Sequence, residues 1–246
     1  MKRKLVNGRW MIWAPDSIAD WDGGTGDPVA RRGWEYERFR SFREHLRWNM
    51  KFFDVGAEHG WISAVLAQEF VNPAGMHLFE PSPEFWVNIR KIWQHNNLDQ
   101  PGGMIPCFVS DHSDLMVDLV AENPFDGWPA TADVGAPEVG GMAYRSLHAP
   151  GHIHSIAIDD YVHISAVYPD AINIDVEGAE LMVLRGAMRT LQTAWPHVWV
   201  SVHPDLMENY GHSKDELLDY MRRACYEPIH LGTDHEEHWL FRPEPF

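Results

Sequence analysis

The sequence has 246 residues, of which 45% are hydrophobic and 23% charged, and its formal net charge at pH 7 is −16. This composition is typical of one folded domain with a substantial core. The excess of carboxylates argues against partners such as nucleic acid or an anionic membrane, because both attract clustered lysine and arginine. No apolar run approaches the roughly 20 residues that span a bilayer. Two widely spaced cysteines, and the lack of an apolar segment after the basic N-terminus, predict a cytoplasmic protein.

Along the chain, short apolar runs alternate with longer segments of helical periodicity. Two of the predicted helices have clear starts, one at Ser82 with Pro83 and one at a capping box of Ser213 with Glu216. The final runs PIHLG and HWLFRP predict an antiparallel hairpin. Strands that alternate with helices indicate an α/β fold with a mostly parallel sheet. The strands are predicted at residues 51–55, 75–81, 105–111, 171–176 and 197–203.

Two regions interrupt this alternation. Residues 1–50 combine a strand-like run, the loop DGGTGDP and a helical segment, and residues 112–155 are rich in glycine, proline and histidine. Long segments without periodicity in a compact domain are usually functional. We therefore expect a single domain over residues 1–246, in which 1–50 is an N-terminal extension or lid and 112–155 is an insertion.

Polar side chains follow the predicted strands at their carboxyl ends. The run INIDVEGAEL, for example, changes from apolar to acidic at Asp175, and Glu177 and Glu180 follow. A single residue of this kind is often a helix N-cap. Ligands of open α/β sheets, however, bind where such strand ends meet. The polar strand ends are Asp54 with Gly56 and Gly60, Glu80, Ser110 with Asp111, Asp175, and His203 with Asp205.

These strand ends favour S-adenosylmethionine over phosphate-bearing cofactors. The dinucleotide fingerprint G-x-G-x-x-G is absent because Glu58 and Trp61 occupy its glycine positions, which disfavours a nicotinamide-dependent oxidoreductase. The loop DGGTGDP lacks the lysine of a P-loop. S-adenosylmethionine has no phosphates, and its sulfonium and amino group suit acidic surroundings. Glu80 would accept both hydroxyls of its ribose.

Five motifs resemble the FkbM-type family of S-adenosylmethionine-dependent methyltransferases over about residues 34–241. They are FFDVGAEHGWIS, HLFEPSPEFWVNIRKIWQHNNL, SIAIDDYV, INIDVEGAELMVLRGA and VSVHPD. The resemblance implies a class I, Rossmann-like methyltransferase fold. It also implies methyl transfer to a hydroxyl oxygen, on a sugar, a lipid-linked glycan, a polyketide or another small metabolite. The cofactor contacts that it implies come from Asp54, Gly56, Ala57, Glu58, Gly60, Glu80, Pro81, Ser110, Asp111 and Asp175.

Three positions depart from the usual pattern of that family. Glu58 stands where the family has asparagine, Asn173 where it has lysine, and Ser201 where it has glutamate. The acidic and glycine positions that suit the cofactor are retained. A non-catalytic S-adenosylmethionine-binding protein that keeps the fold is therefore the alternative to an enzyme.

The predicted chemistry centres on His203, Asp175 and Glu177. An imidazole with a pKa of about 6.5 can accept a proton at neutral pH, so His203 is the expected base and Asp175 orients it or the substrate. In a variant of this mechanism, the same three residues hold a divalent ion, Mg²⁺ or Mn²⁺, that lowers the pKa of a bound hydroxyl. These patterns do not specify the acceptor or the oligomeric state.

Two segments are rich in histidine, HAPGHIH (148–154) and DHEEH (234–238). Neither has a zinc-binding spacing such as H-E-x-x-H, and DHEEH falls at the predicted hairpin turn. Both are therefore expected to be solvated polar segments.

Overall fold

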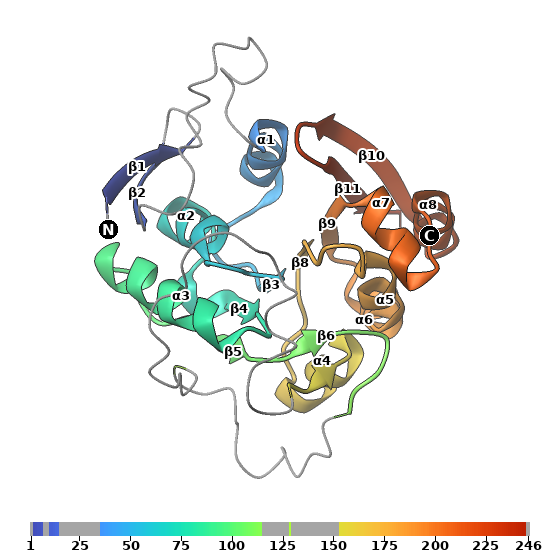
Figure 1. The fold of residues 1–246 in the computed structure, drawn as a ribbon, viewed down its shortest axis with the longest axis horizontal. Helices are drawn as coiled ribbons and strands as arrows, with labels where there is room; N and C mark the ends of the chain where they lie inside the picture. Colours follow the sequence, from blue (N-terminus) through green and yellow to red (C-terminus); the bar gives the residue numbers. More distant parts are fainter. Residues whose placement is uncertain (1, 7–9, 15–34, 115–127, 129–152, 245–246) are drawn as a thin grey trace.

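A seven-stranded sheet in the order β10-β11-β9-β8-β3-β4-β5 forms the centre of the protein (Figure 1). The computed structural model describes residues 2–6, 10–14, 35–114, 128 and 153–244. The hairpin of β10 (Tyr226–Thr233) and β11 (Glu237–Pro243) pairs with β9 in antiparallel orientation. The predicted α/β fold, with a mostly parallel sheet and a C-terminal hairpin, is confirmed. The parallel strands are β9 (His197–Val202), β8 (Ala171–Ile174), β3 (Phe52–Val55), β4 (Met76–Phe79) and β5 (Gly103–Ile105).

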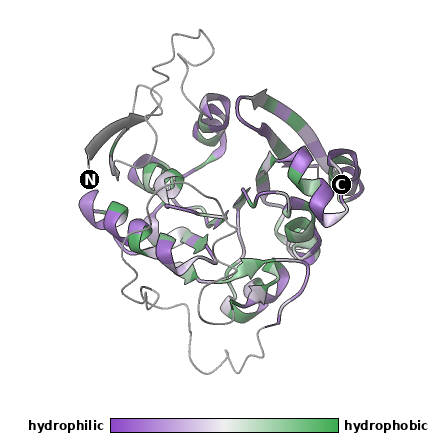
Figure 2. Cartoon of the chain, viewed as in Figure 1, coloured by the Kyte–Doolittle hydropathy of each residue, from purple (hydrophilic) through white to green (hydrophobic). Residues whose placement is uncertain are grey.

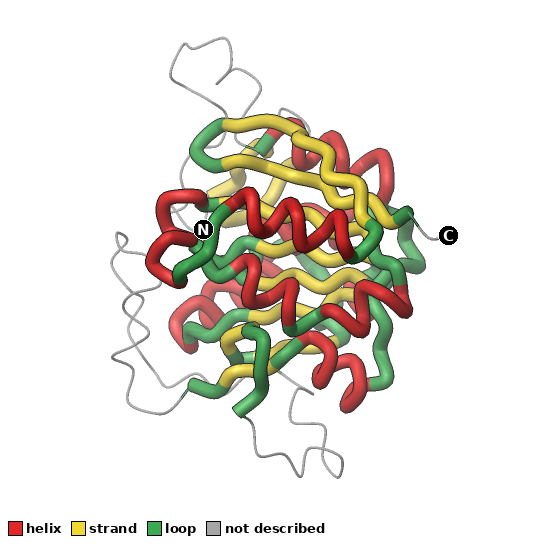
Figure 3. Tube along the Cα trace, turned by 90° about the vertical axis from the view of Figure 1, so that its right-hand side faces the viewer, coloured by secondary structure: helices red, strands yellow, loops and turns green. Residues whose placement is uncertain are grey.

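Helices cover both faces of this sheet, as the layers in Figure 3 show. One face packs against α1 (Tyr36–His45), α2 (Trp61–Glu69) and α3 (Pro83–His95). The other face packs against α4 (Ile158–Ser165), α5 (Glu180–Arg185), α6 (Met188–Ala194), α7 (Pro204–Met207) and α8 (Lys214–Arg223). Short 3-10 helices lie at Pro73–Gly75 and Glu208–Tyr210. Two small pairs stand apart from the sheet: β1 (Lys2–Val6) with β2 (Trp10–Ala14), and β6 (Phe108–Val109) with β7 (Ser155–Ile156).

The central strands are buried on both faces, as expected for parallel strands between helical layers. In β3, Phe53 and Val55 join the core on the α4–α8 face, whereas Phe52 joins the core on the α1–α3 face. Helix α3 presents one apolar side to the sheet, so hydrophilic and hydrophobic colours both occur along it in Figure 2. The buried residues of α3 are Trp86, Ile89, Ile92 and Trp93.

The third predicted strand, residues 105–111, is divided in the structure. β5 ends at Ile105, and β6 pairs with β7 instead of continuing in the main sheet. Pro106 explains the break, because proline has no backbone N–H to donate to the sheet ladder. The chain turns there, with the Cys107 N–H donating to the Ile105 carbonyl at 2.9 Å. Ser110 and Asp111 therefore follow β6 and not a strand of the central sheet.

Most of the two irregular regions lies outside the described residues. This applies to residues 15–34, 115–127 and 129–152, so their expected roles as lid and insertion stay predictions. Among the helices of the part that is described, none has the length and apolar character needed to cross a membrane. Ser213 caps α8 as predicted, with its Oγ accepting the Glu216 N–H at 3.2 Å, while Glu216 Oε1 accepts a hydrogen bond from Arg185 at 2.8 Å.

Candidate active site at the carboxyl edge of the sheet

The carboxyl ends of β3, β4, β8 and β9 lie at one edge of the sheet, because these strands pair in parallel. Asp54 of β3 is 1% exposed. Its carboxylate accepts hydrogen bonds from the Ser63 hydroxyl and from Asn173 Nδ2, the latter at 2.7 Å. Burial raises the pKa of Asp54, and these two bonds oppose the rise. Asp54 thus links β3 to β8 inside the protein.

Glu80 directly follows β4 and is 5% exposed. Its carboxylate oxygens accept backbone hydrogen bonds from Glu58 at 2.9 Å and from Ser82 at 2.7 Å. Burial raises the pKa of Glu80 to about 8, although both backbone bonds favour the charged form. The carboxylate joins the turn after β3 to the start of α3. Ser82 precedes α3 as predicted, but its hydroxyl makes no capping bond.

The turn after β3 depends on glycine at two positions. Gly56 has a φ of +83°, and a Cβ there would lie 1.8 Å from the carbonyl oxygen of Asp175. Gly60 has a φ of +69°, and a Cβ there would lie 2.9 Å from Ile89. The N–H groups of Gly56 and Ala57 both donate to the Phe79 carbonyl of β4, at 2.9 and 3.0 Å. Gly56 therefore lets β3 and β8 end in close contact.

Arg38 of α1 reaches this edge as a buried side chain, 1% exposed. Nη2 donates to Asn173 Oδ1 at 2.5 Å, and Nη1 donates to Ser201 Oγ at 2.6 Å and to Asp175 Oδ2 at 3.3 Å. Burial disfavours its charge, but the surrounding carboxylates outweigh burial and raise the pKa of Arg38. A permanently charged guanidinium thus joins the ends of β8 and β9. Its ion-pair partners also include Glu35 at 3.0 Å and Glu236 at 3.8 Å.

His203 follows β9 and lies between two carboxylates. Nδ1 is 2.7 Å from Glu180 Oε1, and Nε2 is 2.5 Å from Glu236 Oε2. Burial lowers the pKa of His203, but the hydrogen bonds to Glu180 and Glu236 outweigh burial and raise it to about 11. At neutral pH the ring is therefore an imidazolium that donates from both nitrogens. These contacts count against the expected role of His203 as a neutral base.

Asp175 and Glu177 are more open to solvent than the groups behind them. Their side chains are 21% and 42% exposed, and they lie 3.9 and 3.7 Å from His203 Nε2. Burial raises the pKa of Glu177, and the charge of His203 opposes the rise. One ligand atom from each of these three residues lies within 4.8 Å of the others, a spacing that could hold a metal ion. The structure thus brings the predicted catalytic residues together.

Ser110 and Asp111 are held by local contacts. The Ser110 N–H donates to the Ile156 carbonyl at 3.1 Å, and the Asp111 carboxylate pairs with His112 at 2.8 Å. The hydrogen bond from His112 holds the pKa of Asp111 below its usual range. Their predicted contact with the cofactor stays a prediction.

Residues 54–228 match the family model of the methyltransferase FkbM domain. The chain belongs to the FkbM methyltransferase family. The solved methyltransferase FkbM of Methylobacillus flagellatus KT is similar in fold, with 19% identity, a TM-score of 0.50, and coverage of 81% of this chain. This chain spans 45% of the length of that protein. Precorrin-6y C5,15-methyltransferase of Geobacter metallireducens GS-15 aligns over 94% of this chain and 92% of its own, with 11% identity and a TM-score of 0.48. No curated protein gives a significant match.

The departures from the FkbM pattern have structural counterparts. Glu58 has a φ of +47°, in the left-handed region where asparagine is enriched among non-glycine residues. The usual asparagine therefore suits the backbone there. Asn173 and Ser201 replace a lysine and a glutamate, and both accept hydrogen bonds from Arg38. Arg38 therefore joins two of the three positions that depart from the family pattern.

Sequence reasoning missed three residues of the site: Glu35, Arg38 and Glu236. All three lie outside the FkbM-matched segment 54–228. A signal for Arg38 was present, because it precedes Phe42 by one helical turn and shares its buried side. An arginine on the apolar stripe of a helix needs a buried partner.

The expectation that DHEEH is a solvated polar segment is wrong for two of its residues. Glu236 is 8% exposed and His238 is 2% exposed. His238 turns inward because β11 pairs with β9 and places alternate side chains against the protein. Glu236, just before β11, faces His203 and Arg38. Residues 148–152 of the other histidine-rich segment lie outside the described residues.

Proposed function

We propose that this protein transfers a methyl group from S-adenosylmethionine to a hydroxyl oxygen of a sugar, glycan or small metabolite. The observation that carries the proposal is Glu80, an acidic group fixed at the end of β4 by two backbone N–H groups. A carboxylate has about four acceptor sites, so two are left for the ribose hydroxyls. Membership of the FkbM methyltransferase family supports the same reaction.

The charges at the carboxyl edge of the sheet suit a positively charged ligand that has no phosphate groups. Glu58, Asp175 and Glu177 are the carboxylates that reach solvent there, and the cations Arg38 and His203 lie deeper. S-adenosylmethionine, when bound, supplies a methyl group activated on a positively charged sulfur. The chain has to align the acceptor oxygen and receive its proton. The net charge of −16 supports a small-molecule or glycan acceptor over a nucleic acid.

We assign proton acceptance to Glu177, with Asp175 orienting the acceptor. A raised pKa makes the Glu177 carboxylate a stronger base than an ordinary one, and its half-exposed position lets a substrate reach it. His203 donates from both nitrogens and fixes the surrounding carboxylates. In this assignment the imidazolium positions groups, and the carboxylates contact the substrate.

The test is methyl transfer from isotopically labelled S-adenosylmethionine into glycan and metabolite extracts. The proposal predicts labelled products whose methyl group is bound to oxygen. Label found only on nitrogen or carbon would contradict hydroxyl methylation. Tight cofactor binding without transfer into any extract would favour a non-catalytic S-adenosylmethionine-binding protein.

A metal-assisted form of the reaction is the second candidate, because Asp175, Glu177 and His203 can supply three ligand atoms. A metal there would have to replace the hydrogen bond between His203 Nε2 and Glu236. In that case, chelator abolishes turnover and Mg²⁺ or Mn²⁺ restores it. Unchanged turnover in chelator would exclude this form.

A further inference from the structure

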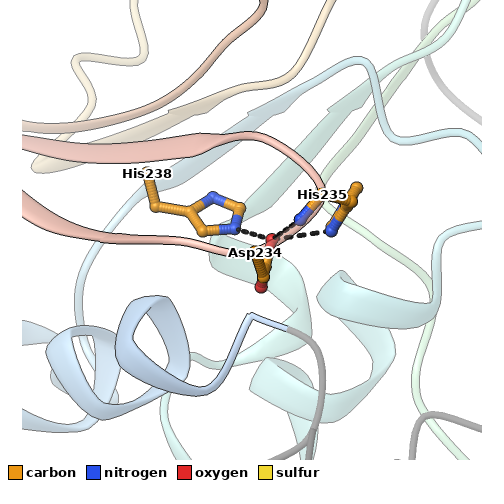
Figure 4. A group of neighbouring side chains, drawn as sticks. All are labelled: Asp234, His235 and His238. Carbon is orange, nitrogen blue, oxygen red and sulfur yellow. Dashed lines mark hydrogen bonds and ion pairs between the residues drawn. The ribbon is translucent and has the colours of Figure 1, made fainter. Parts of the chain in front are cut away.

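The turn between β10 and β11 gathers two imidazoles around one carboxylate. Asp234 Oδ1 lies 2.7 Å from His235 Nδ1 and 3.0 Å from His238 Nε2. Figure 4 shows both rings directed at the same oxygen. One ligand atom from each of the three residues lies within 4.8 Å of the others. This group, called here the turn cluster, shares no residue with the site at His203.

Each member of the turn cluster is held by a further partner. His235 Nε2 is 3.3 Å from Glu236 Oε1, and His238 Nδ1 is 3.4 Å from Ser201 Oγ. Asp234 Oδ2 accepts the backbone N–H of Glu35 at 2.6 Å. Metal-binding histidines typically donate their second N–H to a carboxylate or another oxygen, which leaves the first nitrogen free for the ion. Both histidines have such an oxygen on the side away from Asp234.

The turn cluster is also open on one side. His238 is almost fully buried, with 3% of its side chain exposed, whereas His235 is 37% exposed. An ion would therefore be reached past His235, with the remaining coordination position open to water. Glu35 and Glu236 add negative charge nearby, and Arg38 opposes them as a single positive charge.

We propose that the turn cluster binds one Zn²⁺-like transition metal ion through Asp234 Oδ1, His235 Nδ1 and His238 Nε2. Two imidazoles and one carboxylate form a set that suits zinc, whereas Mg²⁺ prefers oxygen ligands. Ligands of a tetrahedral zinc ion lie roughly 3.3 Å apart, given bond lengths of about 2.0–2.2 Å. The separations of 2.7 and 3.0 Å from Asp234 Oδ1 need to open by a few tenths of an ångström, and the two ring nitrogens lie within 4.8 Å of each other.

The ion has a structural role in this proposal. The outer partners of the turn cluster belong to three elements: Glu35 caps α1, Ser201 lies in β9, and Glu236 belongs to the hairpin turn. A bound ion therefore ties α1 and the hairpin to the sheet, next to the groups that hold His203. This inference is independent of the methyl acceptor.

The experiment is a titration of the metal-free full chain with Zn²⁺, and with Co²⁺ for its visible absorption bands. We expect one equivalent to bind, the tetrahedral cobalt spectrum to appear, and the midpoint of thermal unfolding to rise. Asp234→Asn and His238→Gln should weaken binding by at least about tenfold. His235→Ala alters an exposed residue, so it tests the site in a variant that folds.

Two controls separate this site from others. His230→Gln changes a different histidine of the same hairpin, and Asp175→Asn disables the possible metal site at His203. Both should bind one equivalent as the unaltered protein does. Failure of the unaltered protein to bind, or unchanged affinity in folded His235→Ala and Asp234→Asn, would overturn the proposal. Loss of binding in Asp175→Asn alone would place the ion at His203 instead.

Discussion

At the scale of single residues, burial and pairing decide which groups can do chemistry. Asp54 and Glu80 are almost fully covered, and their hydrogen bonds organise the edge of the sheet, although the two backbone bonds to Glu80 leave it further acceptor sites. Glu177 and Asp175 reach solvent. The sequence predicts His203 as the proton acceptor, because an ordinary imidazole titrates near neutrality. Its partner Glu236 could not be paired with it from sequence, because 33 positions separate the two and the hairpin brings them together.

Glu236→Gln should lower the pKa of His203 from about 11 toward its usual 6.5, because one of two charged acceptors is lost. The folded-state pKa is raised, so the interaction stabilises fully below pH 6.5 and fades as pH rises toward 11. The substitution should therefore lower the free energy of unfolding by about 1.5–3 kcal/mol near pH 6, and by less at pH 9. NMR titration of the imidazole and urea unfolding at both pH values measure these effects.

Glu237→Gln is the matched control for Glu236→Gln. Glu237 is the next residue, and its carboxylate pairs with Lys214 at 2.8 Å, away from His203. Glu237→Gln should leave the pKa of His203 unchanged. A His203 that titrates alike in all three proteins would contradict the role given to Glu236.

At the scale of elements, the sequence predicted the strands and helices well where periodicity is strong. The strands predicted at residues 51–55, 75–81, 171–176 and 197–203 and the final hairpin occur within a few residues of their expected positions, and α3 and α8 follow Ser82 and Ser213 as expected. The error at residues 105–111 arose because apolar character continues across Pro106, whereas the hydrogen-bond ladder does not. The packing of α1 against β8 and β9 could not be predicted, because the contacts of Arg38 cross more than 130 positions of sequence.

Gly56→Ala should destabilise the fold far more than Gly211→Ala. Both glycines have positive φ, so both alanines incur left-handed strain of about 1–2 kcal/mol. A Cβ at position 56 would also lie 1.8 Å from the Asp175 carbonyl, whereas nothing lies within 4 Å at position 211. Chemical denaturation measures the free energy of unfolding of both variants. Equal losses of stability would contradict the close contact between the ends of β3 and β8.

Arg38→Met should lower the free energy of unfolding by about 3–5 kcal/mol, because it leaves buried carboxylates without their cation. Arg40→Met is the control on the same helix, since Arg40 is 57% exposed and its ion pairs are at the surface. Surface changes of this kind usually stay within about 0.5 kcal/mol. Urea unfolding near pH 7 measures both variants. A loss in Arg38→Met no larger than in Arg40→Met would show that the buried network contributes little.

At the scale of the whole molecule, the FkbM-matched segment supplies nearly all of the parallel strands, and segments before and after it complete the sheet and its edge. Arg38 comes from α1, Glu35 directly precedes that helix, and Glu236 comes from the hairpin turn. The family motifs identify the ends of the central strands, because each strand end is marked locally by an apolar run that changes to polar residues. The sequence places Arg38 on the buried side of α1, but the partners of the three outer residues depend on tertiary packing, which single-sequence patterns do not specify.

Residues 15–35 and 112–155 are predicted to line the acceptor site, because they interrupt the α/β pattern of the sequence and long segments of this kind are usually functional. Amide hydrogen exchange in both segments should slow when cofactor or acceptor binds. Mass spectrometry of peptides from these segments, compared with peptides from α8, measures the change. Slowing confined to the strands would place the acceptor site elsewhere.

The most direct test of the account is calorimetric titration of the protein with S-adenosylmethionine, S-adenosylhomocysteine and NAD. We predict that the first two bind and NAD does not. Glu80→Ala should weaken S-adenosylmethionine by about 1.5–3 kcal/mol, roughly 10- to 150-fold, because a charge-assisted bond to the ribose is lost. Glu84→Ala, in the first turn of the same α3, should bind as the unaltered protein does. Binding of NAD in place of S-adenosylmethionine, or unchanged affinity in a folded Glu80→Ala protein, would contradict the account.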